Sequence, residues 1–292
     1  MTSNERAPTH NEGLFSVIEG ILRGLALRGI KCAVRRNADS IAVPYAGDVD
    51  ILIGGKHLDA IIEAVAASAQ ILRVKLSYGG LKVWIRTPDG LMKELDFIWR
   101  ISNWGIIFLD TDDLMEILDT RTVMNGTIPV LSPEGVGRLI YAERTRKEDL
   151  AKYASELRKA GITDMRTRSR ALFLSRRACH APLKTTAGVA SFMLLRLSRL
   201  LCPVGVAVYC ETPIRGDDDR ILQYLFNRRI YKPESFTGRL FYRNIMGGLV
   251  FVDSKKDADV IIDDRNPDIA GQIVEYQRKG GEKPSRFQSW LA

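Results

Sequence analysis

Two acidic residues at alternate positions open a short and strongly apolar segment, Gly47-Asp48-Val49-Asp50-Ile51-Leu52-Ile53. The apolar run predicts a buried strand, and side chains two positions apart on a strand point to the same face. Asp48 and Asp50 are therefore expected to project together, where two like charges repel each other unless a cation lies between them. With glycines at both ends of the strand, the segment predicts an oxygen-ligand site for Mg²⁺ beside a core strand.

A third acid, Asp96, interrupts the apolar strand that is predicted over Met92–Trp99. If this strand pairs beside Val49–Ile53, Asp96 joins the same cluster, and Glu94, which shares its face, is the reserve candidate. Three carboxylates can hold two divalent ions, which together favour in-line displacement at phosphorus. The third acid can also help to deprotonate the attacking hydroxyl.

The pattern up to residue 130 mixes helices and strands, which predicts the α+β class. Apolar residues at helical spacing predict one helix over Leu14–Leu27 and another over Leu58–Ala69. The predicted strands are short and joined by turn residues; they are Lys31–Arg35, Val49–Ile53, Ile71–Tyr78, Leu81–Arg86, Met92–Trp99, and the hairpin of Arg121–Met124 with Thr127–Val130. Residues 13–130 are thus expected to form one domain.

Ser132-Pro133-Glu134 marks a change to a helical pattern, because a capping hydroxyl, a proline at the first helical position and an early acid favour a helix start. Residues 131–202 are expected to be a helical region, and from Arg144 to Arg199 it carries 14 Lys and Arg against 4 Asp and Glu. Two interpretations stay open. The basic residues bind nucleic-acid or acceptor phosphates, or they cover apolar surface on a solvated bundle face. Ala187–Cys202 likewise fits a bundle core or a basic amphipathic helix on a membrane surface.

The net charge and the cysteine content of the chain exclude some classes of protein and favour one kind of partner. Lys and Arg number 43 against 35 Asp and Glu, a net charge of +8 that favours an anionic partner. The 4 cysteines form no C-x-x-C pair and there are 3 histidines, so neither a zinc site nor a disulfide framework is expected. No apolar leader and no membrane-spanning stretch is visible in the sequence, and the expected location is the cytoplasm.

The acid pair, its spacing, the preceding helix and the third acid together resemble the nucleotidyltransferase superfamily, the fold of DNA polymerase β and of the aminoglycoside nucleotidyltransferases. Asp48-Val49-Asp50 matches the acid–apolar–acid pair of the superfamily, and Asp96 matches its third acid. Cys32–Asn37 is similar to the segment before the pair in a bacterial branch associated with polysaccharide biosynthesis. The resemblance covers residues 14–130. It implies a mixed sheet, Mg²⁺, an NTP such as ATP as substrate, and catalytic and metal-binding roles for the three aspartates.

The sequence departs from the superfamily at one place. The superfamily usually carries a Gly-Gly or Gly-Ser pair shortly before the acids, where backbone amides cradle the triphosphate, and that place holds Arg35-Arg36-Asn37 here. Guanidinium groups bind phosphate through paired hydrogen bonds. Arg35, Arg36 and Asn37 are therefore assigned to the triphosphate, with ordinary surface charge as the alternative for the two arginines.

Residues 203–280 predict a small α/β segment with strands at Val204–Tyr209, Leu249–Val252 and Val260–Ile262 and a helix at Asp217–Asn227. Gly247–Asp253 and Asp259–Arg265 weakly resemble thymidylate kinase-like proteins, which follow the nucleotidyltransferase-like domain in some members of that bacterial branch. In place of a phosphate-binding P-loop the chain has Glu211–Asp217. The segment is interpreted as a degenerate kinase-like domain without phosphotransfer activity, in which three consecutive acids start a helix.

Three functional hypotheses are consistent with these patterns. The leading one is a metal-dependent enzyme that moves a nucleoside monophosphate from an NTP to a hydroxyl or phosphate on a small molecule such as a sugar. The alternative is a catalytically inactive module of the same fold that binds nucleotide or RNA, and the third is a membrane-peripheral accessory protein of polysaccharide assembly. The acids also have simpler interpretations: Asp48 and Asp50 in a solvated turn, and Asp96 paired with Lys93 or Arg100.

Overall fold

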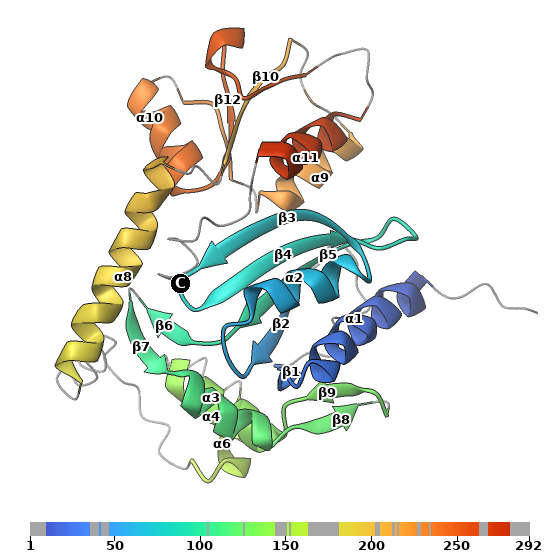
Figure 1. Cartoon of the computed structure of the whole chain (residues 1–292), viewed down its shortest axis with the longest axis vertical. Helices are drawn as coiled ribbons and strands as arrows, with labels where there is room; N and C mark the ends of the chain where they lie inside the picture. The colour runs from blue at the N-terminus through green and yellow to red at the C-terminus, as the bar shows by residue number, and fades with distance from the viewer. Residues whose placement is uncertain are drawn as a thin grey trace, which may run out of the picture. The chain divides into compact units, whose positions relative to one another are not determined.

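A large mixed sheet forms the centre of the N-terminal part of the computed structural model (Figure 1). Its strand order is β3-β4-β5-β2-β1-β9-β8. In chain order the strands are β1 (Cys32–Val34), β2 (Asp48–Ile53), β3 (Gln70–Ser77), β4 (Gly80–Arg86), β5 (Met92–Ile98), β8 (Thr122–Met124) and β9 (Ile128–Val130). β2 runs parallel to β5 and antiparallel to β1, so the predicted mixed sheet is confirmed.

The structure describes residues 10–35, 41, 47–103, 105–124, 126–143, 151, 153–162, 181–201, 205–211, 214, 216–226, 229–233, 235–262 and 268–280. The chain divides into two units: Met1–Ile71 with Ser77–Ser191, here called the first unit, and Leu72–Leu76 with Phe192–Ala292, the second unit. Arg36 and Asn37, and residues 144–150, 152 and 163–180 of the basic block, lie outside the described residues.

The spacing of apolar residues determines which face of each helix in the first unit is buried. In α1 (His10–Leu27), residues Leu14, Ile18, Ile21, Leu22 and Leu25 are fully buried, which is the predicted helical stripe. The predicted second helix is α2 (Leu58–Ala66). A third helix, α3 (Thr111–Asp119), begins with a capping box built on Asp110. A second sheet of β6 (Ile101–Asn103) and β7 (Ile106–Leu109) was not predicted.

Ser132 starts a helix as predicted, because its hydroxyl accepts a hydrogen bond from the backbone N–H of Gly135 at 3.1 Å. The helices of the region after it are α4 (Pro133–Glu143), α6 (Ala154–Lys159) and α8 (Pro182–Leu201). Pro182 is the first residue of α8, a position where the missing N–H of proline costs no hydrogen bond. Within the described residues, no helix has both the length and the apolar character required to cross a membrane.

The second unit contains a fully parallel sheet with the order β11-β12-β10-β13 (Figure 1). Its strands are β10 (Val206–Tyr209), β11 (Ile230–Tyr231), β12 (Leu249–Phe251) and β13 (Val260–Ile261). Its helical segments are α9 (Asp217–Leu225), α10 (Phe236–Leu240), a π-helix (Phe241–Ile245), a 3-10 turn (Lys255–Asp257) and α11 (Ile269–Gly280). The sequence pattern predicted β10, β12, β13 and α9, and it missed β11, α10 and α11.

Gly188 is the point where α8 comes closest to the turn between β6 and β7. A Cβ atom at Gly188 would lie under 3.0 Å from the carbonyl oxygen of Gly105, and this backbone atom has little room to move. At Gly24 in α1, by contrast, an added Cβ would meet Ala64 Cβ at 3.4 Å, an ordinary contact. The two glycines therefore respond differently to the same change.

We expect Gly188→Ala to lower the free energy of unfolding by about 1–3 kcal/mol, because the backbone clash outweighs the better helix propensity of alanine. Gly24→Ala should be neutral or stabilising by up to about 1 kcal/mol, since only the propensity changes. Urea unfolding of both variants measures the difference. Equal free energies for the two variants would show that α8 does not contact the turn at Gly188.

Candidate functional site

Parallel pairing of β2 with β5 brings the predicted acids together. The register places Asp50 opposite Asp96 and Asp48 opposite Glu94, so the alternation of side chains puts all four on one face of the sheet. One carboxylate oxygen from each of Asp48, Asp50 and Asp96 lies within 4.8 Å of the others. The predicted convergence of three aspartates is confirmed, and Glu94 adjoins them as the fourth carboxylate.

Lys82 on β4 supplies a cation to these four acids, here called the carboxylate cluster. Its ammonium lies 2.5 Å from Glu94 Oε1, 3.0 Å from Asp96 Oδ2 and 3.4 Å from Asp48 Oδ2. Antiparallel pairing of β4 with β5 places Lys82 directly opposite Asp96. The sequence analysis missed this residue, since its simpler alternative for Asp96, an ion pair, named Lys93 or Arg100 as the partner.

Arg35 supplies a second cation. Its guanidinium lies 3.5 Å from Asp50 Oδ2, and only 7% of the side chain is exposed. The backbone N–H of Arg35 also donates to the Asp50 carbonyl oxygen at 2.8 Å, which places the residue just beyond the end of β1. Arg35 thus adjoins the acid pair, as its predicted role requires, while its side chain is largely buried against Asp50.

The electrostatics of the carboxylate cluster follow from burial and from its mixed charges. Burial raises the pKa of Asp96 to about 6; the attraction of Lys82 opposes this shift and the repulsion from Asp50 and Asp48 adds to it. Burial alone would lower the pKa of Lys82, but the neighbouring Asp96 and Glu94 raise it above its ordinary value. Lys82 is therefore a permanent cation in contact with three of the four acids.

The three aspartates fit a hard divalent ion. An octahedral Mg²⁺ with bonds of about 2.1 Å separates opposite ligand oxygens by about 4.2 Å. The aspartate oxygens all lie within 4.8 Å of one another, so at most small side-chain shifts would be needed to bind one such ion. Asp48, Asp50 and Asp96 are the residues that would hold the ion, and the Lys82 ammonium would have to leave at least Asp48 and Asp96 for it.

No family model matches the sequence, and no curated protein matches it. Among solved structures, the chain is similar to a crystal structure described as a "putative nucleotidyltransferase from H. pylori". The identity is 13%, the TM-score is 0.32, and the match covers 65% of this chain and 99% of that one. A similarity at this level carries no argument about function, so the function of this chain must be inferred from the carboxylate cluster itself.

Lys82→Met tests the competition between the ammonium and a divalent ion, because it keeps the apolar stem and removes the charge. We expect Mn²⁺ to bind about tenfold tighter or better, since the ion no longer displaces a cation from the same oxygens. Without Mn²⁺ the variant should lose about 2 kcal/mol of stability, because the acids lose their shared partner.

Electron paramagnetic resonance of free Mn²⁺ and thermal unfolding measure these two effects. Lys56→Met is the matched control, because Lys56 is an exposed lysine just after β2. An Mn²⁺ affinity that is the same in Lys82→Met and the unmodified protein would contradict competition at these oxygens.

Mn²⁺ binding should also weaken below pH 6. Asp96, whose pKa is raised to about 6, must release a proton before its carboxylate binds a metal. Protonation therefore competes with the metal on the acid side of this value, and affinity should fall roughly tenfold from pH 7 to pH 5. Mn²⁺ titrations at the two pH values measure it. An affinity unchanged over this range would mean that Asp96 is not a ligand.

Proposed function

We propose that the first unit is a metal-dependent nucleotidyltransferase that moves a nucleoside monophosphate from an NTP to an acceptor hydroxyl or phosphate. The observation that carries the proposal is the convergence of Asp48, Asp50 and Asp96 within 4.8 Å on two parallel core strands. Carboxylates that repel one another are maintained at such distances where a cation is bound. The resemblance of the sequence to the nucleotidyltransferase superfamily supports the same reaction class.

Each residue of the cluster has a role in this proposal. Asp48 and Asp50 hold Mg²⁺, and Asp96 completes the site. Bound there, one or two divalent ions would activate the attacking hydroxyl and neutralise the charge on the leaving pyrophosphate. Asp96 accepts the proton of the acceptor hydroxyl. At the same time the hydroxyl oxygen forms a bond to the α-phosphorus, and the bond between the α-phosphorus and pyrophosphate breaks.

The cations of the site are assigned to the triphosphate. Arg35 lies next to Asp50, so its guanidinium is close to a nucleotide whose phosphates share the metal. Arg36 and Asn37 follow it in the chain and are proposed to contact the same phosphates. Lys82, once released from the acids by a metal ion, is within reach of phosphate oxygens at the same place.

The acceptor class is proposed from the sequence resemblance alone. A sugar or another small molecule with a free hydroxyl fits a reaction of this kind, and polysaccharide assembly is the pathway to examine first. Mass spectrometry of a metabolite extract incubated with the protein, the four common NTPs and Mg²⁺ or Mn²⁺ would identify the transferred group and its acceptor.

A catalytically inactive binding module is the second candidate, and one observation favours it. Lys82 and Arg35 already neutralise part of the carboxylate cluster, so the acids can persist without any metal. This candidate predicts nucleotide or RNA binding that needs no Mg²⁺ and yields no product. Binding that weakens steeply with salt would indicate that basic residues contact the phosphates.

Asp50→Asn separates the two candidates. The change removes one metal-binding charge and keeps the size of the side chain, so we expect Mg²⁺-dependent NTP turnover to fall at least 100-fold, roughly the loss of one strong transition-state interaction. Circular dichroism should show the fold retained. Asp59→Asn, at an exposed acid in the first turn of α2, is the control and should keep full turnover. Full turnover in Asp50→Asn would exclude the proposed metal-binding role.

A further inference from the structure

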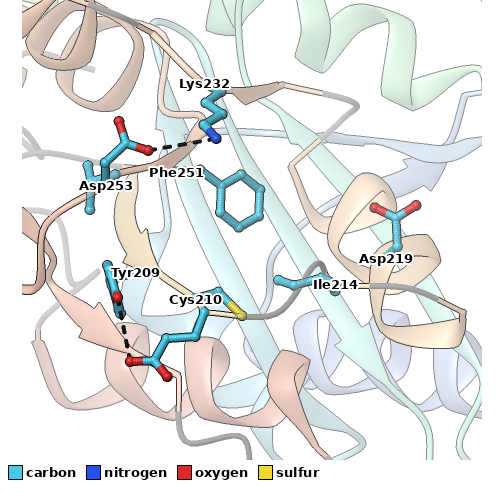
Figure 2. Close-up of a pocket in the computed structure, with 9 residues that line it drawn as sticks. Tyr209, Cys210, Ile214, Asp219, Lys232, Phe251 and Asp253 are labelled. Carbon is cyan, nitrogen blue, oxygen red and sulfur yellow. Dashed lines mark hydrogen bonds and ion pairs between the residues drawn. The ribbon is translucent and has the colours of Figure 1, made fainter.

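The second unit contains a pocket of about 560 Å³ at the carboxyl ends of its parallel strands (Figure 2). Tyr209, Cys210 and Glu211 line it at the end of β10, and Phe251, Val252 and Asp253 line it at the end of β12. Lys232, just after β11, and Asp219, in the first turn of α9, complete two of its sides. This volume is in the range of about 300–1,000 Å³ that small-molecule sites occupy.

Topology marks the same place as a ligand site. From β10 the chain crosses to β11 and β12 on one side, and β13 then pairs on the other side of β10. The strand order therefore reverses at β10. In open parallel sheets, ligands bind outside the carboxyl ends of the strands at such a reversal, because the helices on the two sides diverge there and leave a crevice.

The charged side chains that line this pocket are mostly negative and would repel a phosphate. Among the described lining side chains, three are carboxylates (Glu211, Asp219, Asp253) and one is an ammonium (Lys232). Lys232 lies 3.7 Å from Asp253, and Lys255, just outside the pocket, lies 2.9 Å from Glu211. Each of these lysines thus lies beside an acid that offsets part of its charge, which reduces its attraction for an anionic ligand.

The helix end that would attract a phosphate in such a fold carries negative side chains here. A helix N-terminus ordinarily favours anions through its free N–H groups and its dipole. In α9 that end carries Asp217, Asp218 and Asp219. Asp219 accepts a hydrogen bond from the neutral amide of Gln223 at 2.8 Å, a contact that leaves its negative charge available to a ligand cation.

An aromatic ring supplies the apolar part of the site. Figure 2 shows the Phe251 ring between Lys232 and Ile214, with Asp219 on the far side of Ile214. Apolar walls of this kind bind the body of a ligand, while a few charged groups orient it.

We propose that this pocket binds a small ring compound that carries a protonated amine, and that it discriminates against nucleotides. The ring would pack against Phe251 and Ile214, and the ammonium would pair with Asp219. This ligand class differs from the NTP proposed for the carboxylate cluster, and the inference does not depend on that proposal.

Three indole compounds of similar size test the charge preference on the full chain: tryptamine, tryptophol and indole-3-acetate, with ATP as a competitor of tryptamine. We expect tryptamine to bind about fivefold tighter than neutral tryptophol, which is the contribution of one exposed ion pair, and the anion indole-3-acetate to bind more weakly still. ATP should not displace tryptamine, even where it binds at the carboxylate cluster. Saturation-transfer NMR titrations measure the three indole affinities and the displacement by ATP.

Asp219→Asn should reduce the affinity for tryptamine to that for tryptophol. Asp217→Asn removes the same charge from the same helix end outside the pocket and should preserve the preference. Phe251→Leu should weaken the binding of tryptamine and tryptophol by the same factor, which distinguishes loss of the aromatic ring from loss of the negative charge. Equal affinities for the three indoles, displacement of tryptamine by ATP, or no binding of tryptamine at millimolar concentration would each overturn the proposal.

Discussion

Mutual repulsion of carboxylates is the constraint on which the first unit depends. Four acids lie on one face of the neighbouring parallel strands β2 and β5, because side chains alternate along a strand. The register pairs Asp48 with Glu94 and Asp50 with Asp96. Four like charges at such distances raise the free energy of the folded state unless cations balance them. Lys82 and Arg35 provide part of that balance, and their contacts make the cluster compatible with the core strands beneath it.

The same balance connects stability with function. A cluster neutralised entirely by its own lysine and arginine is a structural ion network, whereas a cluster that exchanges its lysine for a metal ion is a site for phosphoryl chemistry. The two states use the same oxygens, so metal affinity, thermal stability and the protonation of Asp96 are linked quantities. The geometry supports exchange, since the three aspartate oxygens lie within 4.8 Å of one another, a distance suited to one small divalent ion.

The second unit shows how charge determines ligand class within an ordinary architecture. Its parallel sheet, with order β11-β12-β10-β13, places a pocket at the reversal of strand order, where many such sheets bind phosphates. The acids at the start of α9 and at the ends of β10 and β12 make that position unfavourable for an anion. The acids around this crevice therefore say more about the class of ligand than the missing P-loop pattern alone.

Much of this molecule was predictable from local sequence, and the reason is periodicity. The stripe of α1, the strand that begins at Asp48, the turns of the hairpins and the cap at Ser132 depend on residues that are neighbours in the chain. Such local patterns also placed Asp48 and Asp50 on one face. Short elements such as β6, β7 and β11 were missed, because a few residues carry too little periodicity to identify a strand.

The sequence by itself determined which acids could meet; the tertiary structure alone decided that they do, and which cations join them. Asp50 and Asp96 are brought together by a parallel pairing of strands that lie far apart in the chain, and Arg35 reaches Asp50 from just beyond the end of β1. Lys82 was overlooked although its hairpin register with Asp96 follows from the turn between β4 and β5. Contacts between distant segments depend on strand order and register, which are set by the packing of the whole sheet and are not encoded in any one segment.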